Sequence, residues 1–240
     1  MDPDLSSLDA FLDDGGYDAY LVDADSEDST QYYLSGFDAP DPFVTLYDGE
    51  TRLLFNRSLE YGRAVRESRA ATVERYVDYD YGNYAAEFGS DEAAYRVLAD
   101  FLAAYDVDSV AVPPRFPVHV ADGLREQGVA VTADRDDTVT AIRATKTDEE
   151  RAHVRTAQRA NEAAMAAAED LISEAVIRDG TLYHDGDPLT SEAVKTEIEV
   201  TLLRHGCALD ETIVAGGAQA ADPHDRGSGP LRANEAIIVD

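Results

Sequence analysis

A helix-start signal at residues 147–150 divides the sequence into two parts of different character. Thr147 and Glu150 have the spacing of a capping box, in which the hydroxyl and the carboxylate each satisfy an otherwise unpaired backbone N–H. The following residues are rich in alanine and repeat at helical spacing, which predicts one long, closely packed helix. The positions expected to face inward are Val154, Ala157, Asn161, Ala164, Met165, Ala168, Leu171 and Ile172.

Short apolar runs alternate with amphipathic segments before this helix, which predicts an α/β domain over residues 1–140. The runs 43–47 and 52–55 flank Asp48-Gly49, and this pair predicts a β-hairpin because both residues tolerate positive φ. The acidic segment 23–30 is expected to be a loop, and residues 31–37 an aromatic packing turn. The other expected elements are helices over 4–14, 91–105 (capped by Ser90) and 117–127, and strands over 17–22, 109–112 and 128–132.

The second part, residues 141–240, mixes helices with short strands. A helix is expected over 191–205, with Val194, Ile198, Thr201 and Leu202 inward and Gly206 ending it. The polar, turn-rich segment 179–188 is either a loop or a short hairpin.

The last 28 residues hold the candidate site. Two short apolar strands, 213–217 and 236–239, are joined by a Gly-rich loop that contains Pro223-His224, and the second strand stops at Asp240. A carboxylate directly after a buried strand tends to lie at a sheet edge or cleft. Burying it without a partner costs several kcal/mol, so it requires a cation, a metal or water.

Taken in chain order, these segments resemble the M24 metallopeptidases, the family of aminopeptidase P, prolidase and creatinase. The family has a Gly-containing strand, a Pro-His pair, a variable loop and an apolar strand ending in Asp, matched here within residues 213–240. Residues 143–150 resemble the family's Arg-x-x-Lys-Thr/Ser-x-x-Glu segment, and residues 31–37, QYYLSGF, resemble a motif of its N-terminal domain. The resemblance implies an α/β creatinase-like N-terminal domain followed by the beginning of an α+β pita-bread domain.

The same resemblance implies roles for two residues. Asp240 corresponds to the first of five metal ligands, and His224 to the histidine near the scissile bond. The other four ligands lie downstream in the family, after the point where this sequence ends. The chain alone is therefore expected to be inactive, either as a fragment of a longer enzyme or as a truncated gene product.

In a complete protein the resemblance implies two divalent ions, with Mn²⁺ or Co²⁺ expected and Mg²⁺ also suited to oxygen-rich ligands. The implied reaction is hydrolysis of the peptide bond before proline in proline-containing peptides. Two other functions stay open: a creatinase-like hydrolase of non-peptide C–N bonds, and a metal-free module that binds peptides or partners. A homodimer is also expected by resemblance.

The net charge of the chain limits the partners and the solvent conditions that suit it. The formal net charge is −29, with 49 acidic and 20 basic residues, and lysine occurs only as Lys146 and Lys195. With 44% hydrophobic residues, this composition predicts a folded, acid-coated protein adapted to concentrated salt. Such charge disfavours nucleic acid and anionic membranes as partners. The N-terminus lacks a basic, apolar signal, so a cytoplasmic location is expected.

The remaining histidines and the one cysteine carry no chemistry in this interpretation. His119, His153 and His205 lie on expected helices without ligand-spaced neighbours, and His184 is unassigned. Cys207 is expected to be a small core residue near a helix end.

Overall fold

The computed structural model describes residues 3–240, which form two compact units; the first ends at Lys146 and the second is Thr147–Asp240. The capping box predicted from the sequence is present at the start of the second unit. The Thr147 hydroxyl accepts a hydrogen bond from the Glu150 N–H at 3.2 Å, and the Glu150 carboxylate accepts one from the Thr147 N–H at 2.8 Å. No helix among residues 3–240 combines the length and apolar character needed to span a bilayer.

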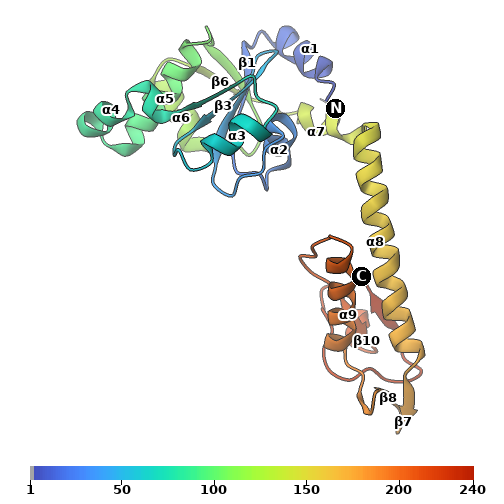
Figure 1. Cartoon of the computed structure of the whole chain (residues 1–240). Helices are drawn as coiled ribbons and strands as arrows, with labels where there is room; N and C mark the ends of the chain where they lie inside the picture. Colours follow the sequence, from blue (N-terminus) through green and yellow to red (C-terminus); the bar gives the residue numbers. More distant parts are fainter. Residues whose placement is uncertain (1–2) are drawn as a thin grey trace. The chain divides into compact units, whose positions relative to one another are not determined.

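The first unit is built on a six-stranded sheet with the order β4-β3-β2-β1-β5-β6 (Figure 1). Strand β2 is antiparallel to both neighbours, and the other pairs are parallel. Strands β1, β3, β4, β5 and β6 therefore all run in one direction. The elements are α1 (Ser6–Gly15), β1 (Ala19–Ala24), α2 (Ser29–Ser35), β2 (Phe43–Tyr47), β3 (Thr51–Phe55), α3 (Tyr61–Glu67), β4 (Thr72–Arg75), η1 (Tyr76–Tyr79), α4 (Tyr81–Phe88), α5 (Ser90–Ala103), β5 (Ser109–Val112), α6 (Val118–Glu126), β6 (Ala130–Ala133) and α7 (Thr138–Ala144).

Strand β1 shows how the sheet divides its core between two faces. Ala19 and Leu21 pack with residues of α5 and α6, whereas Tyr20 and Val22 pack with residues of α1, α2 and α7. This alternation follows from the two-residue period of a strand. Asp23 therefore lies on the α5–α6 face.

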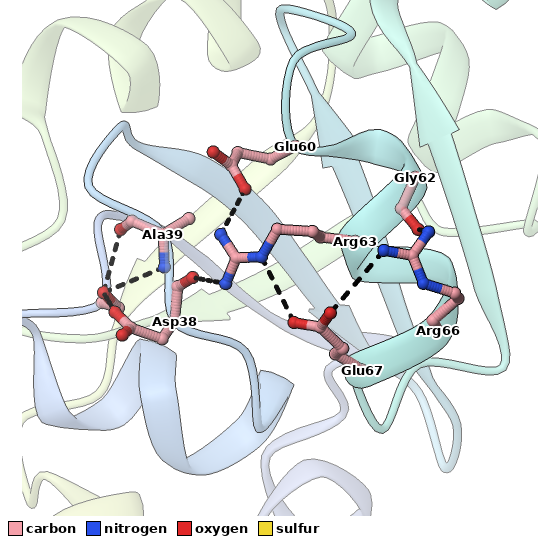
Figure 2. Close-up of polar contacts among 8 residues, drawn as sticks. Asp38, Ala39, Glu60, Gly62, Arg63, Arg66 and Glu67 are labelled. Carbon is pink, nitrogen blue, oxygen red and sulfur yellow. Dashed lines mark hydrogen bonds and ion pairs between the residues drawn. The ribbon is translucent and has the colours of Figure 1, made fainter.

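A third cluster joins α3 to the sheet. The rings of Phe43 and Phe55 stack with centroids 5.0 Å apart, and Phe37 meets both edge-on. Figure 2 shows Arg63 of α3 reaching across to the loop after α2, where its guanidinium donates to the Asp38 carbonyl at 2.9 Å. The same guanidinium pairs with Glu60 at 2.6 Å.

The second unit packs α8 against α9 and two small sheets (Figure 1). Its core contains Ala160, Ala164 and Ala168 of α8, so alanine lets the two helices approach closely. The sheets have the orders β7-β8-β9 and β10-β11. The elements are α8 (Asp148–Ser173), β7 (Val176–Arg178), β8 (Thr181–His184), β9 (Asp187–Pro188), α9 (Ser191–Arg204), β10 (Val214–Gly216), η2 (Gln219–Ala221) and β11 (Ile237–Val239).

The hairpin at Asp48-Gly49 and the α/β class of the first unit are confirmed. Three local predictions were wrong. Residues 31–35 belong to helix α2, which begins within the expected loop because the Asp28 carboxylate caps it. Ser90 does not cap α5; the N-cap is Gly89, because α4 ends directly before it. Four residues of α8 that were expected to face inward are exposed: Val154, Ala157, Asn161 and Met165.

Candidate functional site

The segment 213–240 forms the predicted pair of strands. β10 and β11 are antiparallel, with Val214 opposite Val239 and Gly216 opposite Ile237. Val214 is fully buried in the core of the second unit, which fixes the pair against α8 and α9. The long connection between the strands holds η2 and the Gly-rich loop.

Asp240 follows β11 directly and continues its pairing by one residue. Its N–H donates to the Ile213 carbonyl at 2.9 Å, and its own carbonyl accepts from the Ile213 N–H at 2.7 Å and from the Thr212 hydroxyl at 2.8 Å. The residue is exposed, and its side chain forms no hydrogen bond or ion pair with residues 3–240. The backbone of Asp240 is therefore fixed by strand pairing, and its side chain is exposed.

His224 lies on the loop between the two strands and is exposed. Its backbone N–H donates to the Asp222 carboxylate at 3.0 Å, which orders the turn after Pro223. Within the part of the chain that the structure describes, no hydrogen bond or ion pair joins the side chains of His224 and Asp240.

Two residues of α9 anchor this loop, and sequence reasoning missed both. The Lys195 ammonium donates to the Gly227 carbonyl at 2.9 Å, and both oxygens of the Glu192 carboxylate accept from the Gly229 N–H at 3.2 Å. Hydrogen bonds from the N–H groups of Glu192 and Gly229 lower the pKa of the Glu192 carboxyl. The scarcity of lysine was the one available signal, since Lys195 is one of only two.

The loop also packs tightly on β10. Gly227 has φ of +75°, and a Cβ there would lie 1.7 Å from the Val214 carbonyl oxygen. The Gln219 side-chain amide exchanges two hydrogen bonds with Ser228, at 3.1 Å to its hydroxyl and 3.2 Å from its N–H. These contacts hold the backbone of the loop that carries His224.

Residues 3–240 do not make up a dinuclear metal centre. Such a centre needs terminal and bridging ligands around two ions. No group of three or more His, Cys, Asp or Glu side chains gathers in a metal-binding arrangement within residues 3–240. Asp240 belongs to no such group among the described residues.

The family model of the creatinase/prolidase N-terminal domain matches residues 5–145. The chain belongs to the creatinase/prolidase family. The resemblance to the M24 peptidases and the fold class that it implied are thereby confirmed. A search of curated proteins by sequence finds no match.

Solved structures extend the likeness to the second unit. A prolidase from Pyrococcus furiosus matches with a TM-score of 0.72 and 19% identity, over 98% of this chain and 64% of the prolidase. A prolidase from Pyrococcus horikoshii OT3 matches with 0.68 and 20%, over 98% and 59%. The dipeptidase PepE from Mycobacterium ulcerans matches with 0.63 and 19%, over 98% and 58%. These likenesses show the fold, and the chain spans about three fifths of the length of each relative.

Proposed function

We propose that this chain is part of an Xaa-Pro-type peptidase, which hydrolyses the peptide bond before proline. The observation that carries the proposal is the match to a prolidase fold over 98% of the chain, because a match of that extent continues from the N-terminal domain into the second unit. The substrates are proline-containing peptides. The missing ligands are supplied by residues that follow Asp240 in a longer protein.

Asp240 is proposed as one ligand of a pair of divalent ions, with Mn²⁺ or Co²⁺ the expected metals. When bound, such a pair supplies a water of lowered pKa as the nucleophile. This chain contributes the position of the ligand. Hydrogen bonds with Ile213 and Thr212 fix the backbone of Asp240, and no donor among the described residues competes for its side chain.

His224 is proposed to donate a hydrogen bond to the substrate carbonyl and to the oxyanion that develops from it. The anchoring of the loop by Lys195 and Glu192 supports this role, because a donor aimed at a transition state must be held in place beforehand. The His224 side chain forms no hydrogen bond with the described residues, so none would have to be broken first.

The test uses the chain extended by the reading frame that follows codon 240, purified with Mn²⁺. We expect hydrolysis of Xaa-Pro dipeptides and no turnover of creatine. Turnover of creatine alone would support the C–N hydrolase instead, and saturable peptide binding without turnover would support the metal-free binding module. Each of these two outcomes would overturn the Xaa-Pro proposal.

The role of His224 has its own test in the same extended protein. We expect His224→Ala to lower kcat for an Xaa-Pro dipeptide by about 10²–10³, the usual loss for one oxyanion donor. His153→Ala is the matched control, because His153 is exposed on α8 and is expected to leave the rate unchanged. Equal rates for both variants would remove His224 from the site.

A further inference from the structure

A cavity of about 550 Å³ opens in the first unit, at a place where α/β sheets commonly bind ligands. Three of its lining residues lie at the carboxyl ends of parallel strands: Asp23 near the end of β1, Asn56 directly after β3 and Tyr76 directly after β4. Tyr95 of α5 and His119 of α6 also line it. In open α/β sheets, ligands bind outside the carboxyl ends of the strands, and cavities of this volume hold small molecules.

The cavity lies on the β2 side of β1. Its lining includes Phe43 and Val44 of β2 and Leu54 of β3, and no residue of β5 among residues 3–240. Asp23 is on β1, and His119 lies on the helix that follows β5.

Asp23 is a carboxylate with no hydrogen-bonded partner among the described residues. It is half-buried, and its side chain forms no hydrogen bond or ion pair with the residues that the structure describes. The buried Asp134 of the same unit is satisfied by hydrogen bonds. Its carboxylate accepts them from the Tyr20 hydroxyl and from the N–H groups of Asp136 and Thr138. Burial raises the pKa of Asp23 to about 6, and His119 offsets part of the rise. A ligand cation would supply the missing partner.

The rest of the lining suits an organic cation. Asp91, in the first turn of α5, adds a second carboxylate, and no lysine or arginine within residues 3–240 lines the cavity. The rings of Tyr76 and Tyr95 offer aromatic surface, to which cations are attracted. Apolar lining from Val44, Leu54 and Leu98 suits a hydrocarbon body.

A metal ion fits this cavity less well. Asp23, Asp91 and His119 all line it, yet they do not gather into a metal-binding group, and no other such group exists among residues 3–240. We propose that the cavity binds a small organic cation, with its ammonium or guanidinium group against Asp23 and its apolar body against Tyr76 and Tyr95. This site lies wholly in the first unit and is independent of the peptidase proposal.

Calorimetric titration of the 240-residue chain tests the proposal with benzylamine, agmatine and the neutral analogue benzyl alcohol. The titration is done in about 1 M KCl, where screening over about 3 Å removes diffuse attraction to the acidic surface. We expect saturable binding of benzylamine or agmatine, and binding of benzyl alcohol at least tenfold weaker than that of benzylamine. Binding of neither cation, or equal binding of benzylamine and its alcohol, would overturn the proposal.

Variants locate the binding. Asp23→Asn should weaken binding of the bound cation at least tenfold, whereas Glu126→Gln, which removes an exposed charge from α6, should leave it unchanged. The fold of each variant is checked by circular dichroism. A second readout needs no variant: the imidazole resonances of His119 should shift on titration of the unaltered chain. Unchanged affinity in a folded Asp23→Asn variant, or an unperturbed His119, would contradict the assignment.

Discussion

Substitutions at two glycines of the loop that carries His224 distinguish the cost of backbone strain from the cost of a steric clash. Gly227 and Gly229 both have φ of +75°, but only Gly227 has a close neighbour, the Val214 carbonyl. We expect Gly229→Ala to cost about 1–2 kcal/mol of unfolding free energy, the price of a left-handed residue, and Gly227→Ala to cost clearly more. Urea denaturation of both variants measures the difference. Equal losses would show that the loop does not lie against β10 as described.

Asp23 makes the stability of the chain depend on pH. Its ordinary pKa of 3.8 rises to about 6 in the folded chain because burial disfavours the charged form. The unfolded chain therefore loses this proton first, and stability falls between about pH 4 and pH 6 and stays lowered above that range.

The corresponding variant is Asp23→Asn. We expect it to raise the unfolding free energy on the order of 2 kcal/mol at about pH 8 and to have little effect at about pH 4. Urea denaturation at both values measures this, with Glu126→Gln as the control for loss of one exposed charge. The same gain at both pH values would show that Asp23 is not desolvated.

The sequence revealed some residues of the two proposed sites and concealed others for a physical reason. His224 and Asp240 were recognised because a short segment of chain carries both. The cavity around Asp23 was not, because its lining is gathered by the fold from residues between 23 and 120. His119 was expected to be unimportant, since no neighbour in the sequence reveals that it lines a cavity with Asp23.

At the scale of elements, the capping box is expected to stabilise the start of α8. Replacing Thr147 by alanine removes the acceptor for the Glu150 N–H, and we expect a loss of about 1 kcal/mol. Thr156→Ala is the matched control, since Thr156 is exposed in mid-helix and alanine is the better helix former there. Thermal unfolding followed by circular dichroism compares the two. A cap variant as stable as the control would contradict the assigned helix start.

Local chemistry decided which elements were predictable. The hairpin at Asp48-Gly49 and the start at Thr147 depend on neighbouring residues, and both were correct. The segment 56–90 contains α3, β4, η1 and α4, none of which was predicted, because these short elements depend on tertiary contacts. The hydrophobic period of α8 does not reveal which part of the helix is covered by other elements. Val154 was therefore wrongly expected to face inward, although the buried residues of α8 begin at Ala160.

At the scale of the whole molecule, we propose that the acidic surface adapts the fold to concentrated salt. The formal net charge of −29 produces self-repulsion that salt screens, over about 30 Å at 0.01 M and about 3 Å at 1 M. We expect the melting temperature to rise strongly between millimolar and molar KCl. Sucrose at equal osmolality is the control, and it should give a smaller rise. An unchanged melting temperature across the KCl series would refute the proposal.

The strand order in the sheet of the first unit could not be predicted from the hydrophobic pattern of the sequence. Alternating strands and helices predicted an α/β domain, and that class is correct. The order β4-β3-β2-β1-β5-β6 places β5 beside β1, although three strands separate them in the sequence. Hydrophobic period identifies strands but carries no information about which distant strands pair.

The most direct test of the proposed peptidase compares Asp240→Ala with Asp210→Ala, a control at an exposed acid of the same unit, in the extended protein. The release of proline-containing product from an Xaa-Pro dipeptide is measured with Mn²⁺ and again after a chelator is added. We predict turnover by the unaltered protein and by Asp210→Ala that the chelator abolishes, and no metal-dependent turnover by Asp240→Ala. Full activity of Asp240→Ala, or activity of the unaltered protein that persists in the chelator, would contradict the assignment of Asp240 as a metal ligand.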